Sequence, residues 1–182
     1  MSVKMVIGSW GSYNAGNEKA LGSKWLDLSD YNSWDEVLKE LEKEGFDLKG
    51  IDEELFIQDI EGIDVGNTDY ANPAEIFNTL KESGCLDDED KLKVANAYIE
   101  VNDWEYFAEL VSDKGDNWDE DIYFYENMTP EEVVEELIED TYPDLNFDNL
   151  GWLSNYITID YEGIARDSYE YHEVSNGTIE IR

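Results

Sequence analysis

The excess of acidic over basic residues is the first constraint on how this chain can fold. Its 182 residues include 46 Asp and Glu but only 12 Lys and Arg, a formal net charge of −34. Self-repulsion of this size opposes a compact state. Aromatic residues nevertheless make up 13% of the chain, far more than a disordered acidic tail carries. We therefore expect a folded protein whose acidic surface needs a separate explanation.

The charge argues against two kinds of partner. The sequence has no basic patch that could neutralise phosphates, which excludes direct nucleic-acid binding and, equally, an anionic membrane surface. No stretch reaches the 18 to 20 apolar residues that cross a bilayer. Three explanations of the acidity stay open: mimicry of DNA, calcium binding and adaptation to high salt. Duplex DNA carries one charge per roughly 1.7 Å, so 34 charges correspond to about 58 Å of duplex.

The start of the chain and its cysteine content favour the cytoplasm. Residues 1–17 contain neither a long apolar core nor a signal-peptidase site. The single Cys85 cannot form an internal disulfide, which fits a reducing compartment.

The pattern of apolar and turn residues predicts an α+β fold of three small domains in series. The first, residues 1–64, contains strands at 4–10, 23–28 and 55–60, with a polar loop at 13–17. Its helix starts after Ser33, and Glu36 three residues later predicts a capping box.

The second predicted domain, residues 65–115, is helical. Asn72 followed by Pro73 starts one helix, the acidic run 87–90 starts a second, and Asp103 caps a third. Residues 112–121 are polar and without period, which places a domain boundary there.

The third predicted domain, residues 116–182, is again mixed. A strand at 122–125 precedes a helix that starts at Thr129, and two short helices follow at 150–157 and 160–167. The closing strands, 169–174 and 178–181, flank Asn176-Gly177, a pair typical of two-residue hairpin turns.

The carboxylates are concentrated in the second half of the chain. Residues 115–165 hold fifteen Asp and Glu and no Lys or Arg. In the helix after Thr129 they form two rows at i, i+4, with a carboxylate about every 6 Å along each row. That density approaches the charge density of a DNA duplex. The predicted partner-binding carboxylates are Asp119, Glu120, Asp121, Glu131, Glu132, Glu135, Glu136, Glu139, Asp140 and Asp144.

Signs of catalysis or of a cofactor are few. His172 is the single histidine and Cys85 the single cysteine, and both favour a structural role. The triad Asp116, Asp119 and Asp121 lacks the Gly and the final Glu of a calcium loop. We expect no catalytic residues, no cofactor and no metal, and assign most aromatic residues to the core.

Three patches of the sequence resemble the ArdA antirestriction proteins of conjugative elements and phages. The first is YNAG at residues 13–16 followed by LGSKWLDL at 21–28. The second is FIQDIEG at 56–62, where Gln58 and Ile60 replace the usual His and Tyr. The third is IDYEGIARD at 159–167, with a closing GTIEI at 177–181. The patches follow one another in the order found in the family.

The resemblance implies a fold, an oligomeric state and a partner. It implies three small domains in line and an elongated, bent homodimer joined through the C-terminal region, which follows the path of DNA through a type I restriction-modification enzyme. The patch at Asp160, Tyr161, Arg166 and Asp167 matches the antirestriction motif of the family. For Arg166 we expect a structural role, paired with Asp160 or Asp167 or at the dimer interface.

The leading hypothesis is a DNA-mimic inhibitor that occupies the basic DNA-binding surface of a type I restriction enzyme. An anti-CRISPR inhibitor of an RNA-guided nuclease is the nearest alternative, since such enzymes also hold nucleic acid in a basic channel. A calcium-binding or halophilic acidic structural protein is the alternative from another class.

Overall fold

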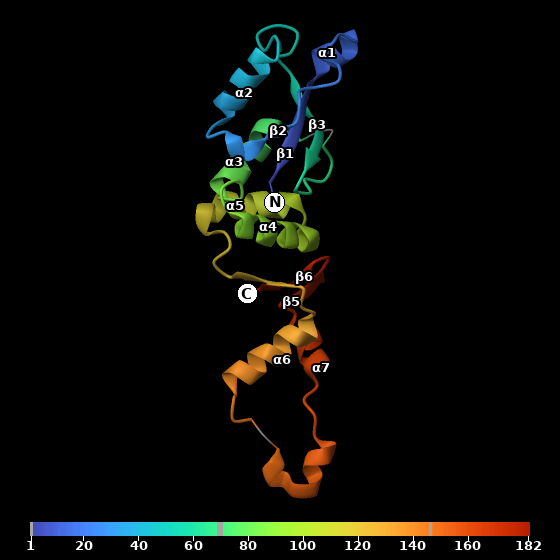
Figure 1. The fold of residues 1–182 in the computed structure, drawn as a ribbon, viewed down its shortest axis with the longest axis vertical. Helices are drawn as coiled ribbons and strands as arrows, with labels where there is room; N and C mark the ends of the chain where they lie inside the picture. The colour runs from blue at the N-terminus through green and yellow to red at the C-terminus, as the bar shows by residue number, and fades with distance from the viewer. Residues whose placement is uncertain (1, 69–70, 146) are drawn as a thin grey trace. The chain divides into compact units, whose positions relative to one another are not determined.

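The chain divides into two units, residues 1–120 (unit 1) and 121–182 (unit 2), each with its own three-stranded sheet and helices (Figure 1). The computed structural model describes residues 2–68, 71–145 and 147–182. Its mixture of helices and sheets confirms the predicted α+β class. Within the described residues, no helix is both long enough and apolar enough to cross a membrane.

The sheet of unit 1 has the antiparallel order β2-β1-β3. Its central strand β1 is Lys4–Ser9 and its edge strands are β2, Leu26–Asp27, and β3, Leu55–Glu61. The buried side chains of Met5, Ile7 and Ile57 form its core face. The strands predicted at 4–10 and 55–60 are confirmed. The strand predicted at 23–28 shortens to β2, because a 3-10 turn, η1 (Leu28–Asp30), follows at once.

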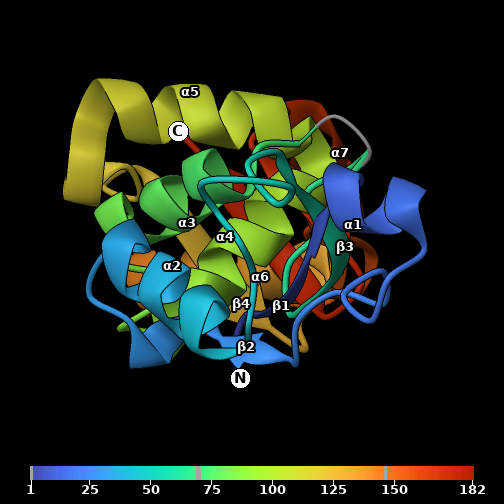
Figure 2. The same cartoon turned by 90° about the horizontal axis from the view of Figure 1, so that it is seen from above.

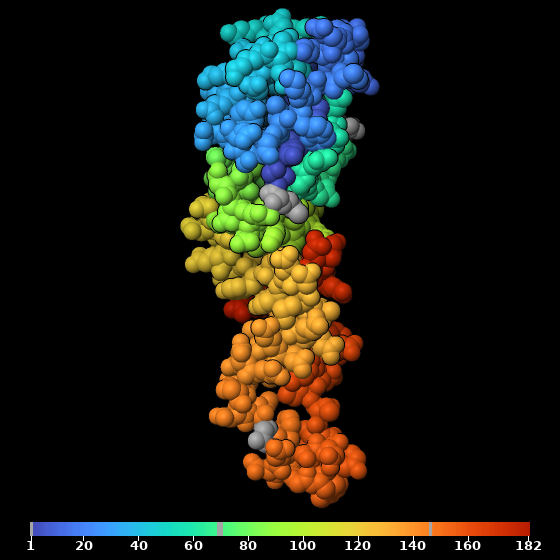
Figure 3. Space-filling view, in the orientation of Figure 1, coloured from blue at the N-terminus to red at the C-terminus, as the bar shows by residue number. Residues whose placement is uncertain are grey.

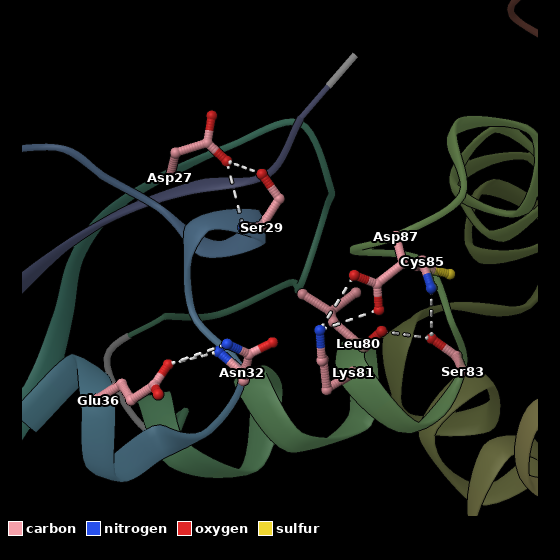
Figure 4. A network of polar contacts seen from close by, with 9 residues as sticks. All are labelled: Asp27, Ser29, Asn32, Glu36, Leu80, Lys81, Ser83, Cys85 and Asp87. Atoms are coloured by element: carbon pink, nitrogen blue, oxygen red, sulfur yellow. Dashed lines mark hydrogen bonds and ion pairs between the residues drawn. The ribbon is translucent and has the colours of Figure 1, made fainter.

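Two local predictions in unit 1 were wrong. The expected polar loop at 13–17 begins inside a short helix, α1 (Trp10–Ala15): the Ser9 hydroxyl accepts from the Ser12 amide, and Gly16 ends the helix with φ 61°. The next helix, α2 (Trp34–Lys43), lacks the predicted capping box. The Ser33 side chain makes no cap, and the Glu36 carboxylate accepts from the Asn32 amide at 2.8 Å (Figure 4).

Three further helices follow among the described residues of unit 1, and the helix starts predicted at Asn72, at the acidic run 87–90 and at Asp103 are confirmed. They are α3 (Pro73–Glu82), α4 (Glu89–Asn102) and α5 (Trp104–Lys114), and their N-caps are Asn72, Asp88 and Asp103. Figures 1 and 2 show α2 and α3 to one side of strands β1 and β3, with α1 on the other side.

The end of unit 1 is anchored by Trp118, in the stretch that looked like a domain boundary. A 3-10 turn, η2 (Gly115–Asn117), leads to Trp118, whose side chain is fully buried. Its indole N–H donates to the Ser83 carbonyl at 3.0 Å, and its ring meets Phe107 edge-on at 5.0 Å. The unit therefore continues to residue 120 and includes both segments 1–64 and 65–115, so the three-domain series is not confirmed.

Unit 2 contains an antiparallel sheet of order β4-β6-β5. The strands are β4, Ile122–Glu126, β5, Tyr171–Val174, and β6, Gly177–Ile181. Two helices pack against each other, α6 (Pro130–Thr141) and α7 (Tyr161–Ser168). Between them lies a 3-10 segment, η3 (Asp148–Tyr156), with a kink at Gly151.

The closing hairpin is confirmed, but its turn lies one residue earlier than predicted. Val174 pairs with Gly177, so Ser175 and Asn176 form the turn. Gly177 belongs to the central strand because it also pairs with Glu126 of β4. A Cβ at Gly177 would lie 2.1 Å from the Tyr125 carbonyl oxygen, so the glycine allows β4 to approach.

Candidate functional site

The start and the inward face of the acidic helix α6 are fixed by residues close together in the sequence. Thr129 and Glu132 form a reciprocal capping box: the Thr129 hydroxyl accepts from the Glu132 amide at 3.3 Å, and the Glu132 carboxylate accepts from the Thr129 amide at 2.8 Å. Pro130 occupies the first turn, where its missing N–H costs no hydrogen bond. Val133 and Val134 are buried and fix the inward face of the helix.

The outward face of α6 presents six carboxylates to solvent. All six are exposed, and within the described part of the chain no Lys or Arg forms an ion pair with any of them. Each like-charge i, i+4 pair destabilises the helix by a few tenths of a kcal/mol. Only Glu132 has a second role, in the capping box. The six are Glu131, Glu132, Glu135, Glu136, Glu139 and Asp140.

The other predicted carboxylates have different surroundings. Glu120, the last residue of unit 1, and Asp121, the first of unit 2, are exposed, and so is Asp144, just after α6. Asp119 is only half exposed, and its carboxylate lies 3.8 Å from the Lys91 ammonium. Asp119 is therefore partly neutralised within unit 1.

Lysines neutralise part of the acidic stretch of unit 1 in the same way. In residues 81–119, which we call the lysine-paired segment, Lys81 pairs with Asp87 at 2.9 Å (Figure 4), Lys91 with Asp116 at 2.5 Å and Lys93 with Asp90 at 3.7 Å. The pKa of Lys91 is raised: burial acts against its charge, but the Asp116 hydrogen bond and nearby Asp119 outweigh that effect.

The motif residues of α7 hold the helix together locally. Asp160 is the N-cap, and its carboxylate accepts from the Gly163 amide at 2.9 Å. Tyr161 is half-buried at the first position of α7. The Arg166 guanidinium lies 3.2 Å from the Asp167 carboxylate, with both side chains exposed. Arg166 thus pairs with Asp167 and not with Asp160, whose carboxylate caps the helix.

Sequence reasoning missed an exposed apolar surface between α6 and α7. The described residues of 142–157, which we call the apolar arm, extend as a lobe from the rest of unit 2 (Figures 1 and 3). Trp152 is 72% exposed and Tyr156 78%, and their rings meet edge-on at 6.0 Å. The sequence assigned 150–157 to a short helix, but periodicity could not reveal that its apolar side chains lack cover. The exposed set is Tyr142, Leu145, Leu150, Trp152, Leu153, Tyr156 and Ile157.

One carboxylate of unit 1 is held inside the fold. Asp52 is buried and accepts from the Ser12 hydroxyl and, at 2.8 Å, from the Asp47 amide. Burial alone would raise the pKa of Asp52, but hydrogen bonds from Ser12, Ser9 and the Asp47 amide hold it below its ordinary value. This carboxylate ties α1 to the loop before β3.

Cys85 occupies an environment that suits packing. It is buried, and this burial raises the pKa of its thiol to about 11. Its amide donates to the Ser83 hydroxyl (Figure 4). Across the residues that the structure describes, no group of three His, Cys, Asp or Glu side chains converges to hold a metal ion.

Together, these features define an acidic α+β protein that presents an unpaired carboxylate helix and an apolar arm to solvent. The antirestriction protein (ArdA) family model matches residues 5–180, nearly the whole chain. The chain therefore belongs to the ArdA antirestriction protein family. A comparison with curated proteins found no match.

Proposed function

We propose that this protein inhibits a type I restriction-modification enzyme by occupying its DNA-binding channel in place of DNA. Family membership supports inhibition of a restriction enzyme, and the acidic surface supports mimicry of DNA as the means. In this mechanism, Lys and Arg side chains that normally bind phosphates meet carboxylates instead. The net charge of −34 steers the association electrostatically. Such an inhibitor acts in the bacterial cytoplasm, stoichiometrically and without catalysis.

The observation that carries this proposal is the outward face of α6. Its six carboxylates are fixed by a capped helix and are not neutralised by ion pairs with Lys or Arg of the described chain. They follow one another at about one charge per 2.5 Å of helix, against one per roughly 1.7 Å in duplex DNA. Because the helix already holds these carboxylates in place, they lose little conformational entropy when a partner binds.

A salt titration with DNA competition tests the proposal. We expect binding to a purified type I enzyme to weaken by about 100-fold or more between 50 and 200 mM salt, as for proteins that release counterions from phosphates. Pre-bound duplex DNA should block the inhibitor completely. Affinity that stays flat across this salt range, or an inhibitor that binds the enzyme–DNA complex unchanged, would contradict the mechanism.

The same preparation decides which enzyme is the target. We expect DNA cleavage by the type I enzyme to stop at near-stoichiometric inhibitor, while a guide-loaded RNA-guided nuclease keeps its activity. The reverse result would assign the same acidic mimicry to an anti-CRISPR role.

We also propose that the protein acts as a homodimer, with the apolar arm as the contact between subunits. Residues 145–159 contain one acidic residue, Asp148, whereas the rest of unit 2 is densely acidic. Two copies of a chain with a charge of −34 repel each other, so the segment with little charge and exposed Trp152 and Tyr156 is the surface that a second copy can approach.

Sedimentation equilibrium tests the dimer. We expect a dimer for the wild type and a dimer dissociation constant raised by about 100-fold for the double variant Trp152→Ser, Tyr156→Ser, since buried aromatic residues dominate such contacts. Tyr169→Ser is the control, because Tyr169 is 86% exposed but lies outside the arm. A monomeric wild type at about 100 μM, or equal effects of both changes, would contradict the assignment.

A further inference from the structure

A groove in unit 1 combines rigid aromatic walls with one carboxylate. It has a volume of about 500 Å³ and lies between α2, the loop before β3 and the start of α3. Its aliphatic lining comes from Leu38, Leu48, Leu55 and Pro73, and its aromatic lining from Trp10, Trp34 and Phe56. The described residues that line it all belong to unit 1.

The aromatic walls are held in place by neighbouring rings. Trp10 stacks on Phe56 with ring centroids 4.3 Å apart, and Tyr13 meets Trp10 edge-on at 5.9 Å. Trp34 packs against the buried Phe77 at 5.9 Å. Rings fixed before a ligand arrives lose little conformational freedom on binding.

The charge around the groove favours a cation. Among the described residues that line it, Glu53 is the single charged side chain, and it is exposed. Guanidinium groups stack on Trp faces and pair with carboxylates, and their methylene stems cover apolar surface. Trp10 keeps 37% of its surface exposed, which leaves ring area for such a stack.

We propose that this groove seats an arginine side chain of the partner's basic surface. The inference rests on the proposed function, which supplies a partner rich in Lys and Arg. The stem of the arginine lies on Leu38 and Leu55, its guanidinium stacks on Trp10, and Glu53 accepts its N–H groups. A neutral apolar ligand gains nothing from Glu53 or from the overall negative charge. The groove thus adds a contact with an apolar component to the electrostatic contact of α6.

A peptide titration of the full chain tests the groove without any enzyme. The probes are acetyl-Gly-Arg-Gly-amide and its citrulline analogue, which is neutral but similar in shape. The readout is the indole N–H resonances of the six tryptophans. We expect the arginine probe to shift the Trp10 and Trp34 signals with saturation and to leave Trp25 unchanged. The citrulline probe should bind about tenfold more weakly, since it lacks the cation.

Two matched pairs of variants separate recognition from folding. Glu53→Gln should weaken the arginine probe about fivefold, while Glu54→Gln, an equal charge change next to the groove, should stay within about twofold. Trp10→Ala should abolish the shift at Trp34, whereas Trp25→Ala, at a similarly exposed position, should not. Should Trp10→Ala fail to fold, the Glu53 pair still decides, because it leaves the ring packing intact.

Three results would overturn the inference: equal binding of both probes, equal effects of the two glutamate changes, or no saturable shift at Trp10. Failure of the groove is distinguishable from failure of DNA mimicry. If Glu53→Gln leaves enzyme inhibition unchanged while neutralising α6 removes it, the groove inference falls and the mimicry stands. If the arginine probe binds the groove but DNA does not compete with the protein for the enzyme, the mimicry falls.

Discussion

The lysine-paired segment of unit 1 and the acidic helix of unit 2 look alike in sequence but use their carboxylates differently. In the first, Asp87, Asp90 and Asp116 lie beside lysines, and Asp88 and Asp103 cap helices. In α6 five of the six acids have neither a capping role nor an ion pair among the described residues.

The difference separates structural acids from available ones. A carboxylate beside a lysine has part of its field cancelled within its own chain, so it offers little to a basic partner. An unpaired carboxylate costs helix stability but keeps its full field for binding. Neutralising each set in turn should therefore damage different properties.

The largest expected effect tests whether a buried anchor holds the lysine-paired segment. Trp118→Ala removes a fully buried ring and its hydrogen bond to Ser83, so we expect the free energy of unfolding to fall by about 3–5 kcal/mol. Trp25→Ala, at a side chain 43% exposed, should cost less than about 1 kcal/mol. Urea denaturation followed by circular dichroism measures both. Equal costs would show that Trp118 does not anchor the segment.

The second prediction is that removing carboxylates from α6 weakens inhibition without lowering stability. The changes Glu135→Gln, Glu136→Gln, Glu139→Gln and Asp140→Asn remove four charges from α6. We expect them to weaken inhibition by about 100-fold at low salt and to leave stability equal or higher, since exposed charge contacts contribute about 0.2–1 kcal/mol each.

The matched variant removes four charges from the lysine-paired segment: Asp87→Asn, Asp90→Asn, Asp116→Asn and Asp119→Asn. It should keep inhibition within about fivefold of wild type and lower stability by about 1–2 kcal/mol. Inhibition assays and melting curves on both variants decide the matter. If both variants lose inhibition to the same degree, net charge alone explains binding, and the two sets of carboxylates do not differ in role.

The third prediction concerns Asp52, the carboxylate held most firmly inside unit 1. Its pKa is lowered in the folded state, so its contribution to stability is complete above the unfolded value of 3.8 and is lost as pH falls through the folded pKa. Asp52→Asn should cost about 1–2 kcal/mol near neutral pH, because it weakens bonds to a charged acceptor. The cost should shrink once the wild type is also protonated. A cost that is constant from pH 7 to pH 2 would contradict the charged role.

The smallest expected effect is a gain in stability. Glu139→Lys places a cation near the C-terminus of α6 and four residues after Glu135, which favours both the helix dipole and an ion pair. We expect stability to rise by about 0.5 kcal/mol and inhibition to fall by several-fold. Glu42→Lys, at an exposed position on α2, is the control for charge and should leave inhibition nearly unchanged. A stability loss at Glu139→Lys would show that the rows on α6 are not self-repulsive.

Most helix starts, which depend on residues close together in the chain, were predicted correctly from the sequence. Asn72, Asp103 and Thr129 cap the helices that they were predicted to start. The acidic run 87–90 was predicted only to favour a helix start, and the structure shows that Asp88 of this run is the N-cap. The capping box predicted for Ser33 and Glu36 was wrong, because the Glu36 carboxylate accepts a hydrogen bond from the Asn32 amide instead. Sequence reasoning also misplaced the last turn, because β4 approaches Gly177 with Tyr125 and Glu126, which lie far away in the sequence.

The sequence by itself determined the α+β class, the outward rows of α6 and the excess of negative charge. These follow from helical period, capping residues and composition, which act within a few residues or do not depend on the fold at all. Only the tertiary structure decided which carboxylates stay available. Lys91 reaches Asp116 across 25 positions, and Trp118 is buried against Phe107 although its neighbours in sequence are polar. Such contacts depend on how segments far apart in the sequence pack together, and local sequence patterns do not predict that packing.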